Sequence, residues 1–278
     1  MNQVSNLQRV LVAVGGSANG HVAVDYSIQL ANRYGCRLVG IDIVDDDDTE
    51  LAIYGVADEA AEAERQREIR QLRERARQNL DAFQQRCSAA GIQTDCCGKK
   101  GDVAEQLLTE AQRSDLIILS RETPFDSATS ANTILGKLLH EASRPMITVP
   151  LALPQEDNVL VAYDGSRSAG QALFAFVALG IGGDRKVHVA TAAFSAESAR
   201  LIAQPAFDFL ELHGIDCQLH AIEAENQVER ALLSLAAELD AGLLVAGACG
   251  HSRIREFLLG SFTQKLIEAS HLPLFLFH

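Results

Sequence analysis

The apolar positions of this 278-residue chain fall into short continuous runs, separated by longer amphipathic segments. Continuous runs of Val, Leu, Ile and Ala are typical of strands in a parallel sheet whose two faces are both covered by helices. The pattern therefore predicts a doubly wound α/β fold. The expected strands are Val10 to Val14, Arg37 to Val44, Leu116 to Leu119 and Met146 to Val149, followed by Val159 to Tyr163, Lys186 to Ala193, Leu243 to Ala246 and Leu274 to Phe277.

Capping residues mark the ends of the helices between these strands. The first expected helix runs from about His21 to Tyr34 and stops at Gly35, a residue common at helix C-termini. Three later helices are expected to begin with a capping box, in which a side chain satisfies a free amide of the first turn. The boxes are Asp102-x-x-Glu105, Asn226-x-x-Glu229 and Ser261-x-x-Gln264.

The two halves of the pattern differ most between Val44 and Gly91. An acidic run, Asp45 to Asp48, precedes a long helical pattern in which apolar residues recur at spacings of three and four. The pattern indicates a helix that packs on one side and is solvated on the other, and a helix that binds a partner remains the alternative. The apolar positions are Ile69, Leu72, Ala76, Leu80 and Phe83.

The chain repeats itself, which divides it into two halves. Residues 10–17, Val-Leu-Val-Ala-Val-Gly-Gly-Ser, match residues 159–166, Val-Leu-Val-Ala-Tyr-Asp-Gly-Ser, and residues 141–145 resemble residues 268–273. The order of elements between these anchors also agrees, so a duplication explains the chain. Two prolines and several polar residues interrupt the pattern at residues 150–158. We therefore expect one domain over residues 1–152 and a second over residues 153–278.

Composition narrows the possible partners. Apolar residues make up 47% of the chain and charged residues 22%, as in a globular protein, and the formal net charge is -13. An acidic surface repels nucleic acid and anionic membranes, so neither is an expected partner. The apolar runs are too short for a signal peptide or a membrane span, which makes the cytoplasm the expected location. The six cysteines form no CxxC pair, and we expect them to be reduced.

Most of the candidate chemistry lies between residues 246 and 265, after a predicted strand and at the start of a predicted helix. Gly247, Gly250 and Gly260 would let backbone amides approach phosphate oxygens, and Ser261 adds a hydroxyl at a helix N-terminus that favours anions. The same residues could also simply form a tight connection from strand to helix. The segment is basic within an acidic chain, through His251, Arg253, Arg255 and Lys265.

This segment resembles the nucleotide motif of the universal stress protein family: Gly, two residues, Gly, nine residues, Gly, then Ser or Thr. Gly247, Gly250, Gly260 and Ser261 match every position, and Asp164 matches the family residue that contacts the nucleoside. The likeness covers essentially the whole chain, once in each half.

The resemblance implies a Rossmann-like or flavodoxin-like fold of the adenine nucleotide α-hydrolase type, with a five-stranded parallel sheet in each half and paired or exchanged closing strands. The implied ligand is ATP, or ADP or AMP, with or without Mg²⁺. The two halves would pair with each other within the chain. Association of two chains into a homodimer is a further possibility that the resemblance leaves open.

The resemblance also places residues around the nucleotide. Ala246 and Gly247 would lie beside the base and ribose, together with Ala192 near the end of the second strand of its half. Phe262 follows the motif serine, where the family usually has a smaller residue. His251 and Arg253, within the glycine loop, complete the expected site.

The first half lacks this motif. An ungapped alignment of the two halves puts Ser120, Thr123, Thr133 and Ile134 at the positions of Gly247, Gly250, Gly260 and Ser261, and Gly15 at that of Asp164. We therefore expect no nucleotide to bind the first half in the same mode.

Two other functions stay open at this point. The chain could be a slow ATPase or self-phosphorylating protein, since Ser252, Ser261 and Thr263 are hydroxyls near the motif, although nothing there resembles a committed general base. It could also be an interaction or ligand-sensing scaffold, with a separate apolar pocket or docking face in the first half. Cys217-x-x-His220 is too small a set for a metal site, and this spacing in a strand points the two side chains to opposite faces.

Overall fold

The computed structural model describes residues 6–15, 18–45, 59–121, 130–183, 185–224, 226–248 and 261–278, in which strands and helices alternate. The first half consists of β1 (Arg9–Ala13), α1 (Ala18–Tyr34), β2 (Arg37–Val44), α2 (Glu59–Ala89), β3 (Thr94–Lys100), α3 (Val103–Ala111), β4 (Leu116–Ser120), α4 (Ala131–Glu141) and β5 (Met146–Val149). The second half consists of β6 (Asn158–Ala162), α5 (Arg167–Leu179), β7 (Val187–Ala193), α6 (Ala196–Leu212), β8 (Cys217–Glu223), α7 (Val228–Glu238), β9 (Ala241–Gly247), α8 (Ser261–Ala269) and β10 (Leu274–Phe277).

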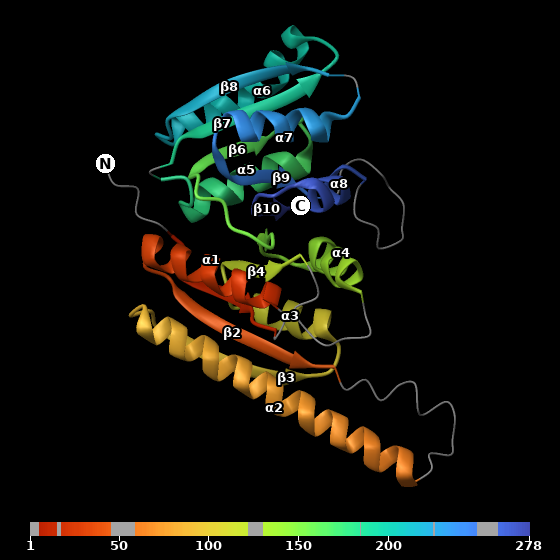
Figure 1. Ribbon diagram of the computed structural model, residues 1–278. Coiled ribbons are helices and arrows are strands. Elements are labelled where there is room, and N and C mark those ends of the chain that lie inside the picture. The colour runs from red at the N-terminus through yellow and green to blue at the C-terminus, as the bar shows by residue number, and fades with distance from the viewer. Residues whose placement is uncertain are drawn as a thin grey trace.

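The ten described strands form one sheet, in the order β3-β2-β1-β4-β5-β10-β9-β6-β7-β8 (Figure 1). Neighbouring strands within each half are parallel. Where the halves meet, β5 and β10 run antiparallel, with Ile147 opposite Phe275. The expected α/β class with a largely parallel sheet is thus confirmed.

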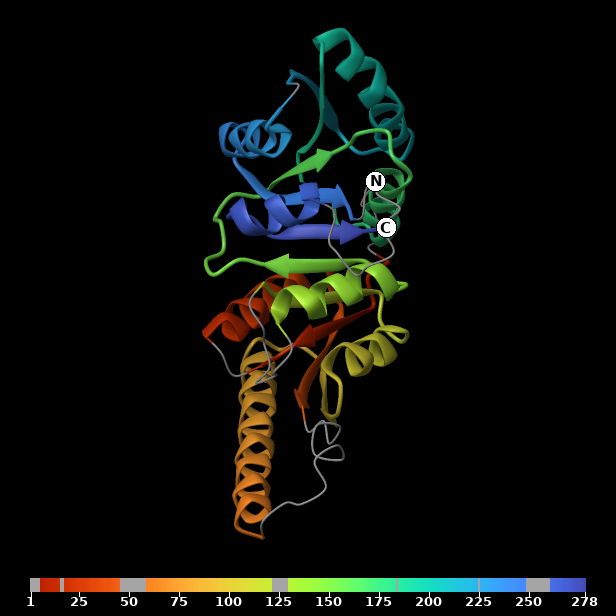
Figure 2. The ribbon, with the colours of Figure 1, turned by 90° about the vertical axis from the view of Figure 1, so that its right-hand side faces the viewer.

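Helices cover both faces of the sheet, because residues along each strand alternate between two apolar cores. Val10 and Val12 of β1 pack on the side of α1, α2, α5 and α6. Leu11 and Ala13 pack on the opposite side, with α3, α4, α7 and α8. Each core contains residues of both halves, so the packing continues across the β5–β10 seam (Figure 2).

Most expected boundaries lie within one or two residues of the observed ones, but two of the three expected capping boxes are wrong. Asp102 caps α3 as expected, since its Oδ1 accepts a hydrogen bond of 2.7 Å from the amide of Glu105. Helix α7 begins two residues after Asn226, behind a left-handed Gln227 that makes no side-chain cap bond. Ser261 is the first residue of α8 and therefore does not precede the helix as a cap. The side-chain amide of Gln264 donates to the carboxylate of Glu268 and does not reach back to the helix start.

The long helix α2 packs on the sheet only near its C-terminal end. Leu80 and Phe83 are buried, whereas Ile69, Leu72 and Ala76 are partly exposed. The N-terminal turns extend past the rest of the first half (Figure 2). The expected one-sided packing therefore holds for the last turns. Most of the acidic run, residues 46–48, lies outside the described part of the chain.

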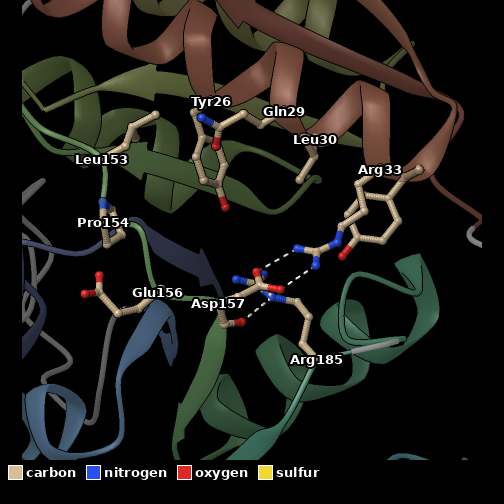
Figure 3. A pocket seen from close by; sticks show the side chains of 11 residues that line it. Tyr26, Gln29, Leu30, Arg33, Leu153, Pro154, Glu156, Asp157 and Arg185 are labelled. Atoms are coloured by element: carbon tan, nitrogen blue, oxygen red, sulfur yellow. Dashed lines mark hydrogen bonds and ion pairs between the residues drawn. The ribbon is translucent and has the colours of Figure 1, made fainter.

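An ionic cluster holds the segment between the halves against α1 (Figure 3). Asp157 accepts hydrogen bonds from both Nη atoms of Arg33, one of them 2.7 Å long, and its carbonyl accepts from Nε of Arg185 at 2.7 Å. These bonds, above all those from Arg33, hold the pKa of Asp157 below its usual value. The cluster borders a cavity of only about 150 Å³, which is small for a ligand site. We therefore interpret the cluster as a structural contact between the two halves.

A second contact between the halves starts from Arg121, directly after β4. Its guanidinium donates to the carbonyls of Ile267, Ser270 and Leu272 at the C-terminal end of α8, at 3.1 Å for Ile267. Burial lowers the pKa of Arg121 to about 10. A cation at a helix C-terminus is favourable because it faces the negative end of the helix dipole. One residue of the first half thus fixes the last helix of the second.

Candidate functional site

A cavity of about 410 Å³ lies at the carboxyl ends of β6, β7 and β9, the edge where parallel α/β sheets bind ligands. The first residues of α5, α7 and α8 close its sides. Its lining consists of Ala162, Tyr163, Asp164, Ser166, Ser168, Ala169, Ala190, Ala192, Val228, Leu232, Gly247, Ser261, Phe262 and Thr263.

A tight turn from β6 to α5 forms one wall. Gly165 adopts a left-handed φ of 76°, and Oδ1 of Asp164 accepts a hydrogen bond of 2.9 Å from the amide of Ser166. Ser166 then caps α5 through Ala169, at 3.2 Å. Because the turn is fixed in this way, the Asp164 carboxylate is held at the mouth of the cavity with hydrogen-bonding capacity for a ligand.

Gly247 brings the end of β9 against the first turn of α5. A Cβ built on Gly247 would lie 2.5 Å from the amide nitrogen of Ala169 and 2.6 Å from the carbonyl carbon of Ser168. Both neighbours are backbone atoms, so they cannot move aside alone. The glycine is therefore required by this close approach, whatever its role toward a ligand.

The first turn of α8 forms the opposite wall, with Ser261, Phe262 and Thr263. The amides of a first helical turn have no partner within the helix and favour an anion. The other expected motif residues, Gly250, His251, Arg253 and Gly260, lie outside the described part of the chain, as do Arg255 and Cys249. Lys265 pairs with Glu229 of α7 at 3.0 Å, so its charge is already balanced.

Small side chains make room for the cavity on the sheet. Ala190 and Ala192 of β7 line it, and Ala190 pairs with Ala162 of β6. In the first half, the equivalent register pairs Ile41 with Ala13, and Ile43 follows on the same face. Both isoleucines are buried, at 0% and 2% exposure. The space that alanines leave open in the second half is thus filled by branched side chains in the first.

The structure brings several of the expected site residues together around this cavity: Asp164, Ala192, Gly247, Ser261 and Phe262. Ala246 is 2% exposed within the sheet and is not part of the lining. Sequence reasoning missed the α5 start and the α7 wall, including Ser168 and Leu232. It also missed Ala190. A strand-by-strand comparison of the two halves would have shown that Ala190 is the equivalent of the bulkier Ile41.

We expect Gly247→Ala to be destabilising. The new methyl group would have to displace the first turn of α5 or the end of β9, which we expect to cost about 2 kcal/mol of unfolding free energy. Urea unfolding followed by circular dichroism measures this. Gly170→Ala is the control, since a Cβ at Gly170 has open space around it in the same helix. Equal unfolding midpoints for the two variants would contradict the close approach.

Two histidines pair on the cavity face of the sheet, close to the cavity. Nδ1 of His188 in β7 and Nε2 of His220 in β8 are 3.0 Å apart, and the opposite Nε2 of His188 is buried without a partner among the described residues. Cys217 points to the other face, toward the carbonyl of Phe207 in α6, which confirms the expected opposite orientation of Cys217 and His220. Within the described part of the chain, no three His, Cys, Asp or Glu side chains group to hold a metal.

The histidine pair predicts acid sensitivity. Burial lowers the pKa of His188 below the ordinary 6.5, aided by the positive charges of His220 and Lys186, and burial also lowers the pKa of His220. A lowered pKa means that the folded state binds protons less readily than the unfolded chain. The contribution of the pair to the free energy of unfolding is therefore fully present above pH 6.5 and is lost as the pH drops below it. His188→Leu should flatten the decline in melting temperature between about pH 6.5 and 5, whereas exposed His271→Leu should not. A wild-type slope in His188→Leu would contradict this assignment.

Comparison with known proteins agrees with the fold and its division. The sequence profile of the universal stress protein family matches residues 6–150 and again 156–278. A curated relative, universal stress protein Slr1230 of Synechocystis, is 26% identical over 167 residues, which is 59% of this chain and 58% of the relative. The chain thus aligns with little more than half the length of that relative.

Two solved structures resemble nearly the whole chain. A universal stress protein from Archaeoglobus fulgidus superimposes with a TM-score of 0.73 at 20% identity, covering 98% of both chains. A Pseudomonas aeruginosa protein described as functionally unknown reaches 0.62 at 14% identity, over 100% of this chain and 94% of its own. At these identities the structures establish the fold alone. Since the family profile matches both halves, this chain belongs to the universal stress protein family and carries two of its domains in tandem.

Proposed function

We propose that this chain binds an adenine nucleotide, ATP or its di- or monophosphate, in the cavity of its second half. The observation that carries the proposal is the cavity of about 410 Å³ between Asp164, Gly247 and Ser261, at the ligand-binding edge of the sheet. Family membership supports the choice of ligand, because Gly247, Gly250, Gly260 and Ser261 follow the nucleotide motif of the family.

Each part of the cavity suits one part of the nucleotide. The apolar lining, with Ala192, Val228 and Leu232, suits the adenine ring. The Asp164 carboxylate can accept hydrogen bonds from ribose hydroxyls, because an ionised carboxylate is a pure acceptor. The amides at the start of α8 suit phosphate oxygens.

The remaining motif residues complete the proposed site. Gly250 and Gly260 would leave backbone amides bare for the phosphates. His251 and Arg253 would add positive charge beside them. Phe262 lines the cavity and would limit its width, and Ala246 would act only as the small residue that precedes Gly247. Mg²⁺, if carried in on the phosphates, would find an oxygen ligand in Asp164, since Mg²⁺ prefers carboxylates.

The first half, which we propose as a degenerate domain over residues 1–152, would bind no nucleotide in this mode. Ile41 and Ile43 fill the equivalent space, and Gly15 provides no carboxylate where the second half has Asp164. Nucleotide occupancy of the second domain, residues 153–278, would then set the conformation or partner choice of the whole chain in a cytoplasmic stress response. The described helices include none that is long and apolar enough to cross a bilayer.

Calorimetric titration with ATP, ADP and AMP tests the proposal. We expect a single nucleotide per chain. Two bound nucleotides per chain would contradict a degenerate first half, and no binding of any of the three would contradict the site itself. Adding γ-labelled ATP under the same conditions separates binding from the alternative of slow hydrolysis or self-phosphorylation.

A further inference from the structure

A second cavity lies in the first half, far from the proposed nucleotide site in the sheet order. It has a volume of about 640 Å³ and lies between α2 and the carboxyl ends of β2 and β3, the outermost strands of that half. Val44 and Lys100, the last residues of these two strands, both line it. We call this cavity the α2 groove. It lies at the same edge of the parallel sheet at which α/β proteins bind ligands.

The floor of the α2 groove is apolar. Ala76 and Leu80 of α2 line it together with Val44 and Gly98 of the sheet. A Cβ built on Gly98 would make an ordinary contact with Leu80, at 3.7 Å. Gly98 is therefore not required for packing, and its missing side chain leaves the floor open.

Positive charges border this floor. Arg73 and Arg77 lie one turn apart on α2, and Lys100 of β3 is on the same face of the sheet as Gly98. Lys99 points to the opposite face, because successive strand residues alternate. The one acid among the described residues of the lining, Asp81, is 4.0 Å from Arg77, with both side chains mostly exposed. Among the described residues of the lining, these three cations and one acid stand out in a chain of net charge -13. The three cations can attract an anionic group to the groove.

A simpler explanation accounts for only part of this charge. Lysines on an edge strand prevent pairing with other strands, which would explain Lys99 and Lys100 on β3. It does not explain Arg73 and Arg77, which lie on the helical wall, nor the apolar floor between the two walls.

We infer that the α2 groove binds a small organic anion with an apolar body, of the aromatic or aliphatic carboxylate class. The volume is within the range of small-molecule sites. An apolar body would cover Ala76 and Leu80, while the anionic group would meet Lys100 and Arg77 at the rim. This site is independent of the proposed nucleotide cavity, so either can fail without the other.

Fluorescence titration tests the inference with two naphthalene probes, anionic 8-anilinonaphthalene-1-sulfonate and its neutral analogue N-phenyl-1-naphthylamine. Gly98→Val, which occupies the floor, should remove a binding component for both probes. Arg77→Gln with Lys100→Gln should weaken that component about tenfold for the anionic probe and leave the neutral probe unchanged. The matched control is Arg67→Gln with Arg70→Gln, two cations of α2 that do not line the groove.

Each result decides between a site and an unspecific surface. Loss of the component in Gly98→Val, together with charge dependence only in the rim variant, supports the inference. It is overturned if Gly98→Val binds both probes as the wild type does, or if the rim and control pairs weaken the anionic probe equally. Circular dichroism melting of each variant checks that the fold is intact, and a soaked probe crystal of the wild type provides the answer should Gly98→Val not fold.

Discussion

Replacing Ala192 by isoleucine is expected to weaken ATP binding by about 100-fold or more, equivalent to roughly 2.7 kcal/mol. Ala192 lines the proposed nucleotide cavity, and its counterpart in the first half is Ile43, which is buried. The larger side chain would occupy the space of the adenine ring without adding a polar group. At this one position, the variant gives the second half the residue that the first half has. Calorimetric titration with ATP measures the effect.

The neighbouring residue provides a matched control for this experiment. Ala193 is in the same strand and its side chain points to the opposite face, because successive residues of a strand alternate. Ala193→Ile makes the same chemical change outside the cavity, and we expect it to leave ATP affinity within about twofold of the wild type. Equal affinities in the two isoleucine variants, with both proteins folded, would mean that the cavity is not the nucleotide site.

Loss of Arg121 is expected to have the largest effect on stability, about 3 kcal/mol for Arg121→Met. The guanidinium donates hydrogen bonds to the carbonyls of Ile267, Ser270 and Leu272. Methionine would keep an unbranched apolar side chain but would have none of these donors. The first turn of α8 lines the proposed nucleotide cavity. Because the loss of Arg121 would loosen the C-terminal end of this helix, the variant should also bind ATP more weakly. Urea unfolding and ATP titration of the same variant measure the two effects.

Arg144 is the control for Arg121. It is also partly buried, and it donates from Nε to the carbonyl of Ser114 at 2.7 Å and from Nη1 to that of its neighbour Ser143 at 3.2 Å, both within the first half. Arg144→Met should therefore cost about 1 kcal/mol and leave ATP affinity unchanged. If both variants unfold at the same urea concentration, the contact between Arg121 and α8 does not stabilise the assembly of the two halves.

Much of the fold could be predicted because its signals are local. Continuous apolar runs marked eight of the ten described strands to within one or two residues, since burial on both faces leaves few polar positions in them. The edge strands β3 and β8 were not marked in this way, because polar and partly exposed residues interrupt them. Gly35 marked the end of α1, and its φ of 72° shows why a residue without a side chain is needed there. The capping box at Asn226 failed because the backbone turns at Gln227 in a left-handed conformation, which the order of residues alone does not reveal.

The candidate site could be predicted only in part because a cavity depends on contacts distant in the sequence. The glycine motif and Asp164 pointed to the edge of the sheet at which the cavity of about 410 Å³ lies. The contributions of α5 and α7 come instead from packing, and residues such as Ser168 and Leu232 carry no motif. The pairing of His188 with His220 depends on the register of β7 and β8, in which His220 lies opposite Ala190.

Photolabelling with 8-azido-ATP, followed by mass spectrometry of the labelled peptides, locates the bound nucleotide in one half or the other. We expect label in peptides of residues 158–278 alone, and we expect it to disappear when excess ATP competes. Label that ATP displaces from peptides of residues 9–149 would contradict this expectation, because a nucleotide would then occupy the half whose space Ile41 and Ile43 fill.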